Sequence, residues 1–81
     1  MGLFRYNTGE TILKQANLTS QINGERQVFT IPDQFVGGSV RLYYNGVRQV
    51  AGETYTESND TQISLQFTPQ VGDFLTCDYA T

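Results

Sequence analysis

Residues 39–50 read SVRLYYNGVRQV, and this stretch decides the fold. Two runs rich in strand-forming residues flank Asn45-Gly46, a dipeptide typical of a type I′ hairpin turn because both of its positions accept a positive φ. A turn of two residues places Tyr44 opposite Val47 on the neighbouring strand. The stretch therefore predicts an antiparallel hairpin, with a bulged turn as the alternative that would shift this register.

The side chains of this hairpin alternate between two faces, because successive residues of a strand point to opposite sides of the sheet. One face takes Val40, Leu42, Tyr44 and Val47. The other face takes Arg41, Tyr43, Arg48 and Val50. Tyrosine and arginine are enriched in protein interfaces, since they bury a large area and keep a polar group. Arg41, Tyr43 and Arg48 are therefore interface candidates, with a solvated sheet face as the competing interpretation.

Further strands lie on either side of the hairpin in the sequence. Strand-like runs occupy residues 28–31, 55–56, 62–68 and 74–79. Turn residues separate them, and Gly72-Asp73 forms the turn before the last strand. Short strands at close spacing with turns between them are typical of a small sandwich or barrel. We therefore expect residues 20–81 to form an all-β domain, a small antiparallel β-sandwich or open barrel.

The first 19 residues differ from the rest of the chain, and we expect residues 1–19 to form an N-terminal arm. Leu3, Phe4 and Tyr6 make an apolar cluster ahead of a polar stretch. Because leaving three large side chains in water is costly, these residues are further interface candidates through which the arm would assemble with its neighbours. Residues 11–18 are compatible with a loose helical turn or with a strand, since Thr and Asn weaken a helix.

Composition excludes several classes of function. The chain has 81 residues, a net charge of −3 and only five Lys and Arg together, too few for the basic surface that nucleic-acid binding needs. No apolar run approaches the roughly 18 residues of a membrane-spanning helix. No signal peptide is visible, so we expect synthesis in a cytoplasm and no membrane partner. A single cysteine cannot form an internal disulfide, and a domain this small commonly gains stability by forming a homo-oligomer.

The sequence offers no catalytic centre. It contains no histidine, which excludes Ser-His-Asp and Cys-His catalysis and histidine-based metal sites. Cys77 alternates with inward residues and is expected in the core. Asp73 and Asp78 could form the carboxylate pair of a glycosidase, but a turn position and an outward position explain them as well. The acidic turn at residues 57–60 lacks the EF-hand pattern, so we expect no metal and no cofactor.

A series of short motifs runs through most of the chain. It comprises residues 22–24 (ING), 28–31 (VFTI), 39–47 (SVRLYYNGV), 52–56 (GETYT), 63–67 (ISLQF), 69–73 (PQVGD) and Tyr79. In order and spacing the series resembles a small β-module that recurs in tail-fibre, baseplate and other virion proteins of tailed bacteriophages. The chain departs from the module at Thr54, where an Asp usually precedes the Tyr-Thr step, and this changes a turn contact.

The resemblance implies a non-enzymatic structural role in a phage particle. A stand-alone module of this kind would decorate the capsid or belong to the tail or baseplate, with other virion proteins as its partners. It would be made in the host bacterial cytoplasm and reside in the virion. The alternative is an attachment module that binds a host-surface carbohydrate or receptor, since tyrosines on flat sheet faces can stack on sugars.

Overall fold

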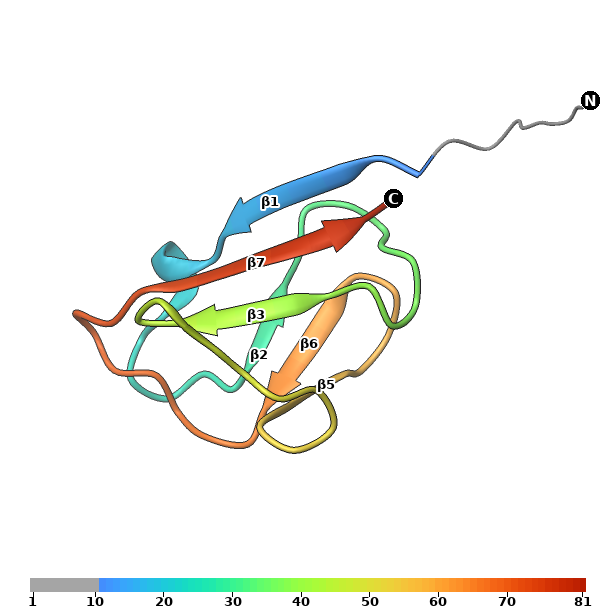
Figure 1. The fold of residues 1–81 in the computed structure, drawn as a ribbon. Helices are drawn as coiled ribbons and strands as arrows, with labels where there is room; N and C mark the ends of the chain where they lie inside the picture. Colours follow the sequence, from blue (N-terminus) through green and yellow to red (C-terminus); the bar gives the residue numbers. More distant parts are fainter. Residues whose placement is uncertain (1–10) are drawn as a thin grey trace, which may run out of the picture.

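The computed structural model describes residues 11–81, which form two antiparallel β-sheets packed around one core (Figure 1). The first sheet, in the order β1-β7-β3-β4, comprises β1 (Leu13–Asn17), β7 (Leu75–Ala80), β3 (Arg41–Tyr44) and β4 (Val47–Arg48). The second sheet, in the order β2-β6-β5, comprises β2 (Val28–Thr30), β6 (Gln62–Leu65) and β5 (Tyr55–Glu57). A short 3-10 helix, η2 (Thr19–Gln21), follows β1. The predicted all-β, sandwich-like class is confirmed. No helix in the described part of the chain is long and apolar enough to cross a membrane.

β3 and β4 form the predicted hairpin with a two-residue turn. Asn45 and Gly46 have φ angles of 52° and 82°, the left-handed values that a type I′ turn requires. Tyr44 faces Val47 across the turn, so the unbulged register is the one observed. The sequence predicts Val47 on the buried face, yet 64% of it is exposed, because β4 has only two residues and lies at the edge of its sheet.

The core is built from alternate residues of the strands. β7 contributes Leu75, Cys77 and Tyr79, each at most 2% exposed, which confirms the inward set that its alternation predicts. β6 contributes Ile63 and Leu65 in the same way. The other large members of the core are Leu18, Phe29, Ile31, Phe35, Val40, Leu42 and Tyr55. Burying each such side chain contributes about 1.5–3 kcal/mol, so this layer between the sheets is the main source of stability.

β6 ends before the end of the predicted strand, residues 62–68. The Gln66 N–H continues the pairing with β5 by donating to the carbonyl oxygen of Thr54 at 2.8 Å. The ladder stops there because the Thr54 N–H donates to the carbonyl oxygen of Val50 at 3.0 Å and not back to Gln66. Phe67 then packs against Tyr44, with the two ring centroids 4.8 Å apart, at the margin of the core. A tertiary contact between aromatic rings therefore replaces the last part of the predicted alternation.

Residues 13–18 belong to the fold in the structure, although they lie within the predicted arm, residues 1–19. β1 pairs with β7 from Leu13, which faces Ala80, and Leu18 is 1% exposed in the core. A strand forms here rather than a helical turn because the backbone of β7 supplies hydrogen bonds along its length, which outweighs weak local propensity. Three interface candidates of the arm lie outside the described residues: Leu3, Phe4 and Tyr6.

Candidate functional site

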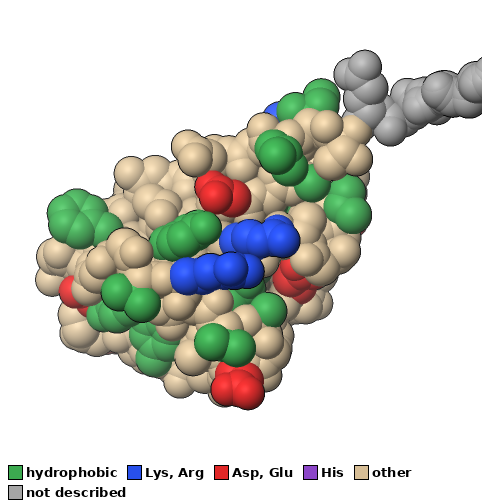
Figure 2. Space-filling model, in the orientation of Figure 1, with side chains coloured by type: hydrophobic (Ala, Val, Ile, Leu, Met, Phe, Trp, Pro, Cys, Tyr) green, Lys and Arg blue, Asp and Glu red, His purple; other side chains and the backbone are tan. Residues whose placement is uncertain are grey.

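The outward side chains of the four-stranded sheet form a continuous surface, the outer face. It comprises Leu13, Gln15, Asn17, Arg41, Tyr43, Arg48, Thr76 and Asp78. The three interface candidates of the hairpin come together here, because Tyr43 faces Arg48 and Arg41 lies two residues before Tyr43 on the same side of β3. Both arginines are exposed and Tyr43 is partly buried. Figure 2, which views this side, shows two basic side chains lying next to each other beside hydrophobic and acidic ones.

β7 and β1 complete the outer face with neighbours that the sequence does not reveal. Asp78 faces Arg41 on one side and Gln15 on the other, and Thr76 faces Tyr43. Within residues 11–81 no ion pair joins Asp78 to Arg41, so Asp78 offsets the positive charge of the arginines only through its place beside them. Alternation within β7 predicts that Asp78 points outward, and this is confirmed. The neighbours of Asp78 depend on the strand order, which the alternation of side chains within one strand does not predict.

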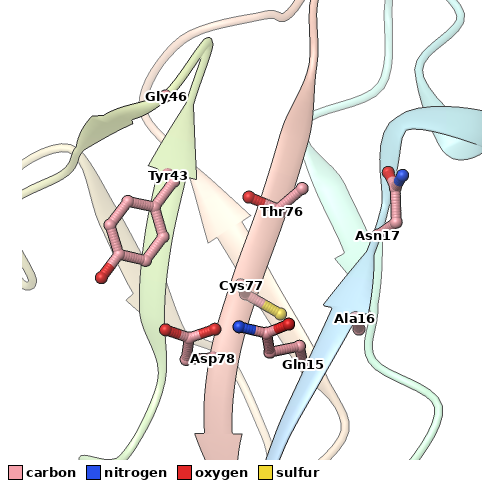
Figure 3. A pocket seen from close by; sticks show the side chains of 8 residues that line it. All are labelled: Gln15, Ala16, Asn17, Tyr43, Gly46, Thr76, Cys77 and Asp78. Atoms are coloured by element: carbon pink, nitrogen blue, oxygen red, sulfur yellow. The ribbon is translucent and has the colours of Figure 1, made fainter.

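A shallow hollow of about 620 Å³ lies on this face where β1, β7 and β3 run side by side (Figure 3). Its lining comprises Gln15, Ala16, Asn17, Tyr43, Gly46, Thr76, Cys77 and Asp78. Figure 3 shows the ring of Tyr43 on one side of Asp78 and the amide of Gln15 on the other. An aromatic ring next to amide and carboxylate groups can accept either a side chain of a protein partner or a polar ring such as a sugar.

The two predicted turns, Asn45-Gly46 and Gly72-Asp73, meet at one end of the sandwich and form a double turn. The Asn45 N–H donates to the carbonyl oxygen of Phe74 at 2.8 Å. In return, the Phe74 N–H donates to the side-chain oxygen of Asn45 at 2.7 Å. Asn45 therefore joins two turns that lie far apart in the sequence, besides supplying the positive φ of its own turn.

Asp73 is the centre of the double turn. Its carboxylate accepts hydrogen bonds from the Tyr44 hydroxyl and from the Gln70 N–H, the latter at 2.8 Å. The bond from Tyr44, and then the bond from Gln70, lower the pKa of Asp73 below its ordinary value of 3.8. The same bond raises the pKa of Tyr44 above its ordinary value of 10.0. A general acid needs a raised carboxyl pKa, so this arrangement fits a turn residue and not a proton donor.

Cys77 lies in the core, as its alternation predicts. Burial is the main cause that raises the pKa of its thiol, to about 11. The thiol is therefore protonated at neutral pH and lacks the exposed thiolate that reactive cysteines carry.

The acidic residues at the end of β5 and in the turn that follows have structural partners within the chain. The Glu57 carboxylate accepts the N–H of Gly38 at 2.8 Å and that of Val40 at 3.2 Å, and thereby holds the loop before β3. Asp60 accepts a hydrogen bond from the side-chain amide of Gln34 at 3.1 Å. Over residues 11–81, the structure has no group of three or more His, Cys, Asp or Glu side chains that could hold a metal ion.

Comparisons with protein-family models, with curated proteins and with solved structures find no match for this chain. Its class is therefore defined by its own geometry. It is a small all-β module of two antiparallel sheets, with an outer face that combines two exposed arginines, a tyrosine and an aspartate. The outer face is the candidate functional site.

Proposed function

We propose that this chain is a non-enzymatic structural protein of a tailed-bacteriophage virion, either a capsid decoration or a component of the tail or baseplate. The observation that carries the proposal is the group of Arg41, Tyr43 and Arg48, gathered on the outer face with both arginines exposed. Tyrosine and arginine at the centre of an interface supply much of its binding energy. The proposed partners are neighbouring virion proteins and further copies of the chain.

The motif series supports the assignment to a phage particle. Its longest motif, residues 39–47, forms the hairpin that carries Tyr43. A second motif, residues 69–73, ends in Asp73, which holds the hairpin through the Tyr44 hydroxyl. The residues that resemble the phage module are thus the ones that build and support the candidate site.

The N-terminal residues supply a second contact in this proposal. Leu3, Phe4 and Tyr6 are large and apolar, and each would contribute about 1.5–3 kcal/mol when buried against a neighbour. Contacts of this size are modest singly and become strong when many copies bind together, because linked binding events reinforce each other. A repetitive particle made of many copies therefore suits this chain better than a single partner.

Incorporation into particles tests the proposal. A phage that lacks its own copy of the gene is complemented with the wild-type chain, with the double variant Tyr43→Ala/Arg48→Ala, or with the control Thr56→Ala on the opposite sheet. Mass spectrometry of purified particles should find the wild type and the control in fixed stoichiometry. The double variant should be reduced at least about tenfold, the effect expected when interface residues of this kind are removed. Wild-type particles that lack the chain, or a double variant that enters them normally, would contradict the proposal.

A carbohydrate-binding attachment module is the second candidate, and the hollow beside Tyr43 is the observation that favours it. Gln15, Asn17 and Asp78 line this hollow and could hydrogen-bond the hydroxyl groups of a sugar that stacks on Tyr43. A glycan array probed with the whole chain separates the two candidates. Binding to host-surface glycans that Tyr43→Ala abolishes, together with normal incorporation of that variant into particles, would favour attachment over assembly.

A further inference from the structure

Four strands lie at the edges of the two sheets, and β1 differs from the other three in length. β4 has two residues, and β2 and β5 have three each, whereas β1 has five. Very short edge strands are one of the means by which proteins prevent unwanted pairing, because a longer edge presents a row of unpaired backbone groups. β1 lacks this protection, and Figure 1 shows it as the outermost strand of its sheet.

The backbone N–H and C=O groups of β1 fall into two sets, one that points to β7 and one that points to the free edge of the sheet. At one end the Ile12 N–H donates to Thr81 and the Thr81 N–H donates back to Ile12, and at the other end the Leu18 N–H donates to Leu75 at 2.8 Å. Since hydrogen-bonded pairs alternate along antiparallel strands, the even-numbered residues of β1 bond to β7. The odd-numbered residues Leu13, Gln15 and Asn17 turn their N–H and C=O groups toward the free edge. Among residues 11–81, β1 has β7 as its one strand partner.

The side chains of β1 do not oppose pairing. Leu13 is 82% exposed and Ile12, just before the strand, is 52% exposed, so contact there would remove apolar surface from water. Lys14 is the one charged residue of the strand, and its ammonium group lies 3.5 Å from the carboxylate of Asp33. The strand also contains no proline, the residue that often protects an edge.

We propose that β1 pairs with β1 of a second copy of this chain, antiparallel and across a two-fold axis at Gln15. In this register Gln15 faces Gln15 of the second copy, and Leu13 faces Asn17. Every hydrogen-bonded pair then joins two odd-numbered residues, which are the ones whose backbone groups point to the edge. A two-fold axis at Lys14 would instead place two like charges opposite each other, which destabilises a sheet. The self-matching pattern is the reason for choosing a second copy as the partner.

This pairing joins two four-stranded sheets into one eight-stranded sheet. Because paired residues of neighbouring strands point to the same side, the outer faces of both copies form one surface with two sets of the residues Arg41, Tyr43 and Arg48. The inference goes beyond the proposed function and does not depend on it, since a dimer of this kind could form in any location.

Sedimentation equilibrium of the whole chain tests the inference with a matched pair of variants. Gln15→Pro removes an N–H that points to the free edge and leaves the bonds to β7 in place, a position where proline is tolerated. Gln15→Ala keeps that N–H and removes only the side chain. The wild type and Gln15→Ala should form dimers as concentration rises, and Gln15→Pro should raise the dissociation constant at least about tenfold. A wild type that stays monomeric, or a proline variant that associates as the wild type does, would overturn the inference.

Crosslinking keeps the test decisive if Gln15→Pro fails to fold. Facing residues of a hydrogen-bonded pair have Cα atoms about 5.5 Å apart, within the range that a disulfide spans. Gln15→Cys should therefore form a disulfide-linked dimer under mild oxidation, whereas Thr56→Cys on β5 should not. Equal crosslinking of the two variants, or none in either, rules out the pairing at Gln15.

Discussion

The double turn and the free edge of β1 treat their polar groups in opposite ways. In the double turn, Asn45 and Asp73 bond to partners from another turn of the same chain through both backbone and side-chain atoms. Along β1, the odd-numbered residues carry backbone groups that no strand within residues 11–81 meets. Satisfied polar groups hold a small fold together, whereas an unpaired strand edge is available to another chain. We therefore assign the first region to folding and propose that the second serves association.

The largest effect should come from the point where β1 joins the core. Leu18, directly after the strand, is 1% exposed, whereas Leu13 at its start is 82% exposed. Leu18→Ala should lower the free energy of unfolding by about 2–5 kcal/mol, because it leaves a cavity in the core. Leu13→Ala should change it by less than about 0.5 kcal/mol. Chemical denaturation measures both free energies of unfolding. Similar losses in the two variants would mean that Leu13 is packed as firmly as Leu18, and that the start of β1 is not an exposed edge.

The stability of the double turn should fall when a residue that disfavours a positive φ replaces Gly46, even though the new side chain has room. A Cβ atom on Gly46 would meet no atom within 4 Å, but the φ of 82° resists a β-branched residue. Gly46→Val should therefore cost about 1–3 kcal/mol, seen as a lower melting temperature. Gly37→Ala is the matched control, since Gly37 has equal space and no positive φ. An unchanged melting temperature for Gly46→Val would contradict the assigned turn.

Acid should weaken the double turn in a defined direction. Because the folded state lowers the pKa of Asp73 below 3.8, it favours the charged carboxylate. The resulting stabilisation is complete above the ordinary carboxyl pKa and is lost as the pH falls through the lower folded pKa. Asp73→Asn and Tyr44→Phe should each reduce the loss of stability below about pH 4. Thermal melts at several pH values measure it, and identical pH profiles for the wild type and both variants would argue against the role of Asp73.

Local patterns predict much of this fold because they depend on nearby residues. The Asn45-Gly46 dipeptide predicts the hairpin and its register, and alternation predicts the inward position of Cys77. β1 is not predictable in this way, since its Thr- and Asn-containing surroundings carry no clear period and its strand form depends on pairing with β7. The contact between Asp73 and the Tyr44 hydroxyl joins residues that are distant in sequence, so only the packed structure reveals it.

The candidate site, too, is predictable from the sequence only in part. Alternation within one hairpin suffices to group Arg41, Tyr43 and Arg48 on one side. The addition of Gln15 and Asp78 requires the strand order β1-β7-β3, which places β7 beside the hairpin and β1 on the far side of β7. A local pattern therefore predicts which side chains point outward, and tertiary pairing determines what they lie next to.

Hydrogen exchange of individual β1 amides, measured on the wild-type chain at low and high concentration, tests the division between folding and association most directly. The amides of Lys14 and Ala16 bond to β7 and should be protected at every concentration. Those of Leu13, Gln15 and Asn17 should exchange fast in dilute solution and slowly in concentrated solution, because they become protected only when a second copy binds. Slow exchange of these three amides at both concentrations would mean that the chain covers its own edge. Fast exchange at both concentrations would mean that no second copy covers it. Either result would contradict the account.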